Sequence, residues 1–592
     1  MPKILSRAAC LGLALISSLG IMSASVTLQL TPSVGTAPVG TTVTWTATAT
    51  DSANSSASFT YQFSVGSSAS TLQVRRDFSS LNQFPWTEAD QEGTYDIQVV
   101  AKEASSNATA TTAETFIITS RVTGSSPVVS ATGHPLVALY SAPACPSGAS
   151  AQVQFRRTAG TYWWVTPLKP CNGTTSMNFY IAGMKPSTQY LLQGYVYNGA
   201  HQSANAPAYF TTGAVPSNVT IENFDISTPE QYTASPIVLT SPTSGIPFAT
   251  DSVSTIMWYL PSVPGGYLTR PVPGGTFLGV FDDNSGIVGN RRLVREYDLA
   301  GNLVRETNAA AISAQLTARG TDPITSIHHE AFRFPNGDTG IIGSVEKVTN
   351  QGSGTVDVLG DMAIVLDSNL QVKFFWNEFN ELNIMNQAVL HETCVQGNAG
   401  CPHLYQPGYS VANDWTHSNS LAPTPDGNLI ISIRHQDEVV KIDYNNGNGD
   451  GHILWRLGRN HDFSVQSNNP YPWFTHQHDV TFQSNGILTL FDNGNTRIAE
   501  YGGNSRGQAW QLDETHMVAT PVLNLDMGVF SMATGSAELL SNGDYHFFLG
   551  FVNNDSSKSV EYTPGGALQF EEDEPQDVGY RSFRMITLYS EF

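Results

Sequence analysis

Short runs of alternating apolar and polar residues are frequent in the N-terminal part of the chain. Thr42–Ala47 and Tyr95–Val100 show the pattern clearly. Successive side chains of a β-strand point to opposite faces, so this period of two predicts strands with one buried face. The runs between residues 26 and 120 therefore predict one β-sandwich of the immunoglobulin-like type.

A second sandwich, of the fibronectin III-like type, is predicted over residues 121–215. Its segment Gly183–Tyr190, followed by the strand-like run Leu191–Tyr197, resembles the tyrosine-bearing strand entry of fibronectin type III modules. The stretch Thr211–Asn218 is typical of a linker. Neither sandwich contains a cluster of nucleophile, base and acid, which favours a role as spacer or substrate-presenting module.

The remainder of the chain contains an internal repeat. Each unit has a glycine-containing turn followed by an apolar strand, such as Leu429–Ile433 or Ile487–Phe491. The turns lie at Gly274-Gly275, Asn336-Gly337, Asp426-Gly427, Asn485-Gly486 and Asn542-Gly543. Most spacings are about 60 residues, and an insertion over Asn377–Asn413 explains the longest gap.

This repeat predicts a six-bladed β-propeller over residues 216–592, because propeller blades are four-stranded sheets that recur around one axis. The five turns mark five blades, and the sixth is inferred from the two ends of the region. Met257–Leu260 and Arg584–Tyr589 would complete one blade and close the ring. The fold class expected for the whole chain is all-β.

Composition and charge narrow the function classes. The 592 residues include 50 Asp plus Glu against 28 Lys plus Arg, a formal net charge of -22. Such an acidic chain repels polyphosphate and anionic lipid surfaces, so no nucleic-acid partner is expected. The low charged fraction of 13% and the recurrent Gly, Thr, Ser and Val agree with many short strands joined by turns.

The first residues have the features of a secretory signal. Lys3 and Arg7 precede a mostly apolar run, Ala8–Met22, and small residues follow at Ser23–Ser25. We expect a signal peptide over residues 1–25 and an exported mature protein, periplasmic, extracellular or at the cell surface. A transmembrane anchor is the alternative, but the run is short, and no membrane span is expected after signal removal.

Four cysteines remain after the predicted signal, an even number that permits two disulfides in an exported protein. Four cysteines allow three pairings, and we favour the two local ones, Cys145 with Cys171 and Cys394 with Cys401. The alternative for the second pair is a metal site with His391 or His403. Its spacing matches no zinc signature, so no metal is assigned.

Alignment of the repeats places chemically active residues in one slot. His329, Asn419 and His478 each lie seven residues before their turn, and Tyr267 has the same place in the first unit. His417 and His476 lie two residues before Asn419 and His478, and should share a face with them if the strand alternation holds. The inner strands of a propeller line its channel, so we expect these groups around one axial cavity.

A single histidine in a strand is more often structural than catalytic. Several His and Asn residues in one slot of different units favour a functional cluster, because blades need apolar packing residues rather than imidazoles for stability.

Several runs in the predicted propeller are specific enough to compare with a known family. They are Ile327–Glu330 with Pro335–Gly337, Asp414–Ser420, Ser432–Gln436, Ile453–Gly458, and Gln477–Asp479 through Asn495. In these runs the sequence resembles the bacterial arylsulfate sulfotransferase family. The resemblance is strong from about residue 320 to 500, weaker over the rest of the predicted propeller, and does not cover both sandwiches. The family usually has a smaller N-terminal β-domain, which leaves the natural substrate and the attachment open.

The resemblance implies transfer of a sulfuryl group from a phenolic sulfate ester to a phenol, without the usual nucleotide donor, through a sulfohistidine. Carried over by motif, the sulfurylated residue corresponds to His478, and its polar partners to His417, Asn419 and Arg434. The first family histidine falls within His328-His329, and the repeat alignment selects His329.

These residue types suit the chemistry. A neutral imidazole can attack at neutral pH and form a covalent intermediate that divides one difficult transfer into two. Arg434 would bind the sulfuryl oxygens with a fixed fork of donors, while His417 and His329 would hold the sulfate or protonate the departing phenolate. His328, His476 and Tyr267 are expected to contact the substrate.

Two other functions compete with a transferase. An aryl sulfate hydrolase would use water to resolve the same intermediate, but the Cys-x-Pro-x-Arg motif of type I sulfatases is absent. A non-catalytic carbohydrate-binding or adhesive protein would agree with the two sandwiches and with propellers that serve as scaffolds. The expected partners are a small phenolic sulfate and a phenolic acceptor, a homodimer is compatible with the sequence, and no organic cofactor is expected. A structural cation in the channel stays open.

Overall fold

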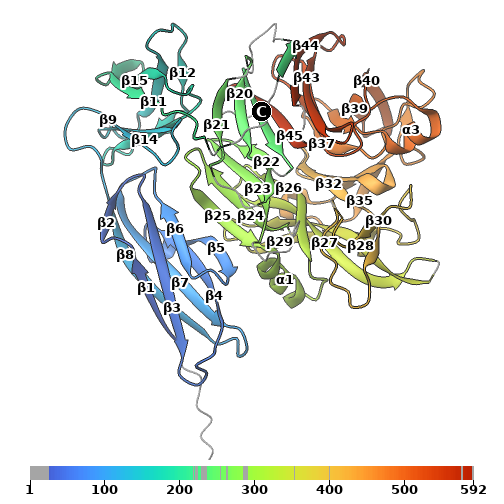
Figure 1. Cartoon of the computed structure of the whole chain (residues 1–592), viewed down its shortest axis with the longest axis horizontal. Helices are drawn as coiled ribbons and strands as arrows, with labels where there is room; N and C mark the ends of the chain where they lie inside the picture. Colours follow the sequence, from blue (N-terminus) through green and yellow to red (C-terminus); the bar gives the residue numbers. More distant parts are fainter. Residues whose placement is uncertain are drawn as a thin grey trace, which may run out of the picture.

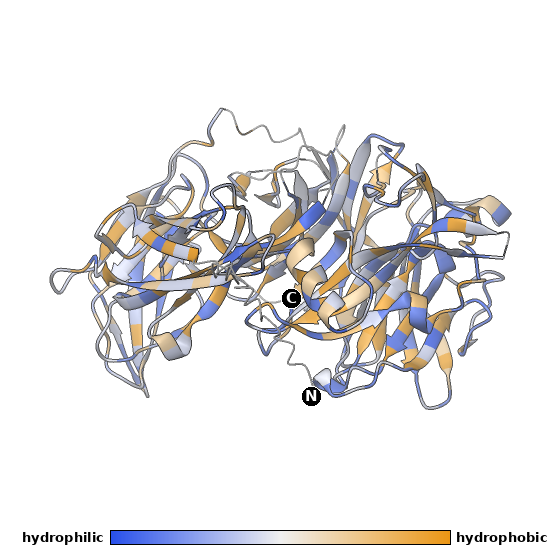
Figure 2. Cartoon of the chain, turned by 90° about the horizontal axis from the view of Figure 1, so that it is seen from below, coloured by the Kyte–Doolittle hydropathy of each residue, from blue (hydrophilic) through white to orange (hydrophobic). Residues whose placement is uncertain are grey.

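The computed structural model describes residues 26–589, except for 218, 220–224, 229–235, 244, 254, 262–264, 284–290, 353, 399 and 575–577. The chain is all-β, with 53% strand and 6% helix. Hydrophobic and hydrophilic residues are interspersed along the strands throughout, as half-buried sheets require (Figure 2). The predicted signal peptide lies outside the described residues. None of the described helices is both long and apolar enough to cross a bilayer.

The first N-terminal domain has two sheets around one core (Figure 1). Trp45, Phe63 and Val99 are fully buried between them, because each occupies the inward position of an alternating run. One sheet has the order β1 (Val26–Pro32), β3 (Thr42–Asp51), β6 (Gln83–Thr87). The other has β2 (Thr36–Pro38), β8 (Thr109–Thr119), β7 (Gly93–Glu103), β4 (Phe59–Gly66), β5 (Gln73–Ser79).

The second domain also has two sheets, and the disulfide Cys145–Cys171 belongs to its core. Tyr190 is buried, and its hydroxyl accepts the backbone N–H of Lys185 at 2.8 Å, which ties the strand entry to the preceding turn. The strands are β9 (Val128–Ala131), β10 (Ala138–Ala142), β14 (Met177–Ile181), and β11 (Ser150–Arg157), β12 (Trp164–Val165), β13 (Lys169–Pro170), β15 (Gln189–Asn198), β16 (His201–Ala204), β17 (Ala208–Thr211).

The rest of the described chain forms mainly antiparallel sheets whose strands mostly follow sequence order. The first contains β22 (Gly266–Val272), β23 (Thr276–Asp282), β24 (Arg291–Asp298) and β25 (Leu303–Asn308). The second contains β26 (Ser326–Arg333), β27 (Thr339–Asn350), β28 (Thr355–Leu366) and β29 (Val372–Asn377), and is extended by β30 (Thr393–Val395) and β31 (Val411–Asp414), with β28 and β31 parallel. The third contains β32 (Ser418–Pro423), β33 (Leu429–Ile433), β34 (Glu438–Ile442) and β35 (Ile453–Gly458).

The next sheets complete the series. The fourth contains β37 (His478–Phe482), β38 (Ile487–Asp492), β39 (Arg506–Asp513) and β40 (Val518–Asp526), with β36 (Ser464–Val465) at its edge, parallel to β40. The fifth contains β41 (Ser536–Leu539), β42 (Tyr545–Val552), β43 (Ser556–Tyr562) and β44 (Leu568–Glu574), with β18 (Asp225–Thr228) at its edge. The sixth contains β45 (Gly579–Met585), β19 (Ile237–Pro242), β20 (Phe248–Asp251) and β21 (Ile256–Tyr259). The two ends of this region thus pair with each other, although the pairing uses Gly579–Met585 rather than a strand that reaches Tyr589.

One strand of each of these sheets lies on a common inner ring. In the described chain, β22 contacts β26, β26 contacts β32, β32 contacts β37, β37 contacts β41, β41 contacts β45, and β45 contacts β22 again. The helices α1 (Ala309–Ala318), α2 (Glu378–Glu381) and α3 (Asn495–Tyr501) lie in connections between strands. This closed series gathers residues from distant parts of the sequence.

The first N-terminal domain is joined to the ring region through a shared sheet edge. Strand β5 pairs in parallel with β25 at Arg76 and Glu306, whose side chains form a buried ion pair at 3.0 Å. Thr307 donates its hydroxyl to Asp77 at 3.0 Å. The second domain is tied in as well, since the Tyr589 hydroxyl donates to the Tyr180 carbonyl at 2.7 Å. Both domains are thus built into the ring region rather than tethered to it.

Arg76→Met should destabilise the protein. The change leaves the buried carboxylate of Glu306 with Arg295 as its remaining ion-pair partner, at a cost of about 1–3 kcal/mol. Differential scanning calorimetry should show a lower melting temperature, while Arg157→Met, an exposed arginine of β11, should leave it unchanged. Equal melting temperatures for the two variants would contradict an energetically important edge junction.

Candidate functional site

Three histidines from different inner strands come together on the ring. The rings of His329 and His417 are 5.0 Å apart between centroids, and those of His329 and His478 are 6.1 Å apart. These residues come from β26, the residue before β32, and the first residue of β37. The repeat alignment thus selected histidines that the fold brings into one cluster.

The backbone turns sharply at three histidines in and near this cluster. His329, His417 and His476 have left-handed backbone angles, with φ of 59°, 50° and 51°. Such angles cost a non-glycine residue about 1–3 kcal/mol and concentrate at functional sites. Strands β32 and β37 begin only after His417 and His476, so strand alternation does not extend to these two residues.

His478 is buried and its tautomer is fixed by Asn493. The Asn493 amide nitrogen donates to the carbonyls of Ser531 and Thr534, at 2.8 and 3.0 Å. Its carbonyl oxygen must therefore face His478, where it lies 2.6 Å from Nδ1. Because an amide oxygen only accepts, Nδ1 of His478 carries the hydrogen and Nε2 keeps its lone pair.

The charge state of His478 also favours a nucleophile. Burial and the positive charge of Arg434 hold the pKa of His478 well below its usual range. The imidazole is therefore neutral at neutral pH. Within the described residues, Nε2 of His478 makes no hydrogen bond, so its lone pair is available to a ligand.

His417 has a carboxylate partner instead of an amide. Its Nδ1 lies 2.7 Å from Oδ2 of Asp414, and its side chain is 21% exposed. Although burial opposes ionisation, the neighbouring His417 and His435 hold the pKa of Asp414 below its usual range. A charged Asp414 accepts from Nδ1 of His417 and so fixes the orientation of the ring.

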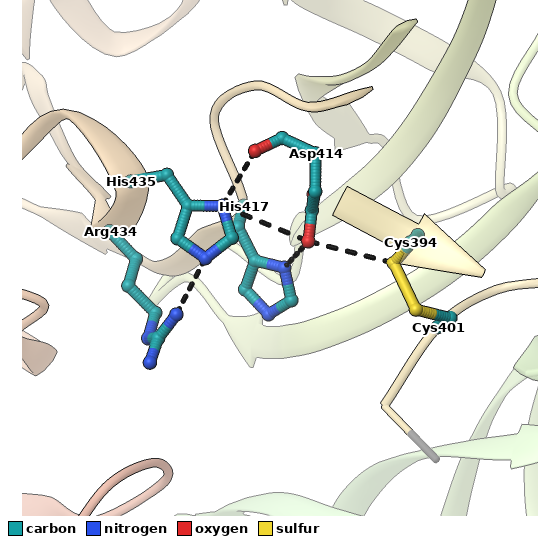
Figure 3. The surroundings of a disulfide bond; sticks show 6 residues. All are labelled: Cys394, Cys401, Asp414, His417, Arg434 and His435. Carbon is teal, nitrogen blue, oxygen red and sulfur yellow. Dashed lines mark hydrogen bonds and ion pairs between the residues drawn. A yellow bond between two sulfur atoms is a disulfide. The ribbon is translucent and has the colours of Figure 1, made fainter. Parts of the chain in front are cut away.

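Arg434 lies beside His435 (Figure 3), and it is the cation that most lowers the pKa of His478. Its guanidinium donates to Nε2 of His435 at 2.5 Å and to the Met532 carbonyl at 3.1 Å. Burial lowers the pKa of His435 to about 3, so that ring is neutral and accepts from Arg434, while its Nδ1 donates to the Asp414 carbonyl at 2.7 Å. The Nε of Arg434 is buried without a partner among the described residues.

Tyr267 and Asn419 position their neighbours. The Tyr267 hydroxyl accepts the backbone N–H of His329 at 2.8 Å, and the Tyr580 hydroxyl donates to the His329 carbonyl. The two tyrosine rings stack with centroids 3.8 Å apart, so they clamp the strained His329 backbone. The Asn419 amide donates to the Gln477 carbonyl at 2.7 Å, next to His478.

His476 lies apart from this cluster. Its Nδ1 lies 2.8 Å from Asp437 and its Nε2 lies 2.5 Å from Glu392, which belongs to the insertion. Because both ring nitrogens are engaged by carboxylates, the ring anchors the insertion. Although burial opposes it, the hydrogen bond from His476 lowers the pKa of Glu392 to about 2.

The insertion also contains the disulfide Cys394–Cys401, and Cys394 Sγ is 3.6 Å from the Asp414 carboxylate (Figure 3). The disulfide removes the two thiolates that a metal site with His391 or His403 would need. In the described part of the chain, two groups near the site could bring three ligand atoms together. They are Glu392, His435 and His476, and Asp414, His417 and His435. Nδ1 of His417 and both ring nitrogens of His435 and His476 already make hydrogen bonds, so the geometry does not call for an ion.

A cavity of about 220 Å³ has Trp415 and Gln436 in its wall, and these residues lie close in sequence to His417 and His435. The other lining residues are Leu382, Asn383, Asn386, Glu438, Arg456 and His461. The insertion thus supplies part of the wall, whereas His329, His417 and His478 are not among the lining residues.

Sequence reasoning did not find several of these residues. Asn493 lies in a run that matched the family pattern, but no role followed from the run alone. Asp414 and His435 lay in such runs too, and nothing in their spacing showed which histidine they would support. Tyr580 contacts His329 only because β45, near the end of the chain, pairs with β19 and so joins the ring of inner strands.

The fold and the site define a class of protein: an all-β protein in which a closed series of inner strands gathers several histidines beside a buried arginine. Residues 206–581 match the family model Arylsulfotransferase (ASST). This match spans more than half of the chain, so the protein belongs to this family. An aryl sulfotransferase activity in general follows from this membership.

Comparison with solved structures adds nothing to this assignment. A quinonprotein alcohol dehydrogenase-like protein from Bacteroides thetaiotaomicron is 12% identical, with 94% of this chain and 97% of that chain covered and a TM-score of 0.27. The chicken interferon gamma receptor alpha chain is 11% identical, with 31% and 97% covered and a TM-score of 0.12. TM-scores this low carry no argument. None of the curated proteins matches this chain.

Glu392→Gln should loosen the insertion at neutral pH. The depressed pKa of Glu392 means that its charge stabilises the attachment above the ordinary value of 4.5 and that this contribution is lost as the pH falls through about 2. At pH 7 the variant lacks the charge, and hydrogen–deuterium exchange should be faster in residues 378–395. Glu381→Gln, an exposed carboxylate in α2, is the control. Unchanged exchange in Glu392→Gln would show that the insertion is anchored elsewhere.

Proposed function

We propose that the protein transfers a sulfuryl group from an aryl sulfate ester to a phenol, with His478 as the covalent carrier and without a nucleotide sulfate donor. The observation that carries the proposal is the free Nε2 lone pair of a neutral His478, fixed by Asn493 and lying near a buried arginine. Sulfuryl transfer needs an in-line nucleophile and cations around the equatorial oxygens.

In the first half-reaction, Nε2 of His478 attacks sulfur and an N–S bond forms as the S–O(aryl) bond breaks. The bonding pair leaves with the aryl oxygen, which takes a proton to become a phenol. Arg434 donates to the sulfuryl oxygens, where its positive charge offsets the charge of the transferred group, and His417 lines the same side of the site. The product is sulfohistidine at position 478.

In the second half-reaction, the oxygen of an acceptor phenol attacks the same sulfur and loses its proton. The N–S bond breaks, its electron pair returns to Nε2, and His478 regains the neutral state. Because donor product leaves before acceptor enters, the kinetics are ping-pong. Water in place of the phenol would give hydrolysis of the ester.

The proposed architecture places this site in a six-bladed β-propeller over residues 216–592. The closed series of inner strands and the pairing of the two chain ends support six blades. Residues 26–120 and 121–215 would be immunoglobulin-like and fibronectin III-like sandwiches that act as spacers, after removal of a signal peptide over residues 1–25. Two disulfides agree with an exported protein.

His478→Ala should remove the covalent step and lower the transfer rate by several orders of magnitude, because no other group carries the sulfuryl group between donor and acceptor. The measurement is phenol release from an aryl sulfate with and without an acceptor phenol. Mass spectrometry of wild-type protein mixed with donor alone, kept at alkaline pH, should find an added sulfuryl group on the peptide that contains His478.

Two outcomes would overturn this assignment. A sulfuryl group on another residue, or normal turnover in His478→Ala, would exclude His478 as carrier. Release that an acceptor phenol does not stimulate would identify a hydrolase, and no release at all would favour a binding protein.

Asn493→Ala should lower the transfer rate by about 100-fold or more, since the imidazole of His478 is then free to adopt the wrong tautomer. Binding of the aryl sulfate should persist, so the loss should appear in kcat. The control is Asn504→Ala, which removes an amide that donates to Asp526 away from the cluster. If both variants retain wild-type kcat, Asn493 does not determine the tautomer.

A further inference from the structure

A chain of three polar side chains leads away from the cluster through His329. Nδ1 of His329 lies 2.6 Å from Nδ1 of His328. On its other side, Nε2 of His328 lies 2.8 Å from Oδ1 of Asp361 in β28. The His328 side chain is 14% exposed and that of Asp361 is 5% exposed, so the outer end of the chain is shielded from water.

Asp361 acts in this chain only as an acceptor. Its Oδ2 accepts the backbone N–H of Ser418 at 2.6 Å and the hydroxyl of Thr416 at 3.0 Å. Its neighbour Glu378 accepts the Asp361 backbone N–H at 2.9 Å. Burial and the charge of Asp361 raise the pKa of Glu378 to about 8, so Glu378 holds the proton of this carboxyl pair at neutral pH.

An ionised Asp361 fixes the hydrogen positions along the chain. Because it offers no proton, Nε2 of His328 must carry a hydrogen. In the state with fewer protons, Nδ1 of His329 donates to Nδ1 of His328, and Nε2 of His329 keeps a lone pair. In the state with one more proton, His328 is an imidazolium beside Asp361, its Nδ1 donates to His329, and Nε2 of His329 carries a hydrogen.

We propose that Asp361 and His328 are positioning residues that make His329 a reversible proton carrier for both half-reactions. The proposal rests on the proposed function and adds to it which groups handle the proton. His329 is well placed for this role, because its ring lies 5.0 Å from that of His417 and 6.1 Å from that of His478. In this proposal the stored proton resides on His328, because the Asp361 carboxylate contacts His328, whereas burial and the nearby His328 lower the pKa of His329 itself.

The proton balance closes over one catalytic cycle. As the S–O(aryl) bond breaks, Nε2 of His329 gives its hydrogen to the departing aryl oxygen, and the hydrogen between the two Nδ1 atoms shifts from His328 to His329. When the acceptor phenol attacks sulfohistidine, Nε2 of His329 takes the phenolic proton, and the shared hydrogen shifts back. No other acid or base is required.

The test uses the full chain and two donors with different leaving groups. Phenyl sulfate needs protonation of its oxygen, whereas 4-nitrophenyl sulfate releases a stable phenolate that needs little. In single-turnover experiments, His328→Gln and Asp361→Asn should slow phenyl sulfate by about 100-fold or more and 4-nitrophenyl sulfate by only a few-fold. Equal slowing of both donors would reduce the two residues to a structural role and overturn the proposal.

The matched control is Asp513→Asn. Asp513 and His516 form a carboxylate–imidazole pair at 2.7 Å like that of Asp361 and His328, but both side chains are exposed and lie away from the cluster. Wild-type rates with both donors are expected in this variant. A donor-dependent loss here would show that the effect does not come from the buried chain.

A measurement on the wild-type protein keeps the proposal testable if the buried variants do not fold. NMR of protein labelled with ¹⁵N-histidine should show, in the state with fewer protons, His329 protonated at Nδ1 and bare at Nε2. The opposite tautomer would overturn the proposal. If wild type forms no sulfohistidine, the proposed function fails instead, whereas normal sulfohistidine formation with the wrong tautomer would overturn only the proton chain.

Discussion

A buried ion network on the inner ring is the constraint on which the site depends. It joins four of the sheets through Arg270 of β22, Glu330 of β26, Asp479 of β37 and Arg581 of β45. Arg581 lies 2.9 Å from Glu330 and 3.5 Å from Asp479, and the Arg581 side chain is only 1% exposed. Although burial opposes it, Arg270 and Arg581 hold the pKa of Asp479 below its usual range, so the four groups balance two positive and two negative charges. Removal of one member would leave a buried charge unpaired, at a cost of about 3–5 kcal/mol.

This network positions the chemistry because its members follow the site residues in sequence. Glu330 comes directly after His329, Asp479 directly after His478, and Arg581 directly after Tyr580. Strands β26, β37 and β45 thus each have one residue in the ion network and the preceding one at the site. The left-handed angles at His329 and Asp479 and the irregular strand register beside them allow both residues of a pair to reach their partners. The electrostatic attraction within the ion network stabilises the strained backbone at the neighbouring cluster residues.

The histidines of the cluster differ through their partners rather than through their own chemistry. An amide at His478 gives a neutral ring with a free Nε2, and a carboxylate at His417 accepts from Nδ1 and orients the ring. The chain has a formal net charge of -22, yet a buried arginine and several imidazoles lie together at this cluster.

The sequence by itself determined the all-β class, the repeated turns, the family, and the slot that contains His329 and His478. These features are local, because the period of two, the Gly-containing turns and the spacing of a repeat are properties of neighbouring residues. Tertiary structure alone decided which group each histidine meets. His417 and His476 occupy equivalent places in the repeat, yet one faces the cluster and the other binds Glu392 of the insertion, because both precede their strands and alternation does not constrain them. The physical reason is that a side chain's protonation and orientation depend on burial and on hydrogen-bond partners, and these partners become neighbours only when the ring of strands closes.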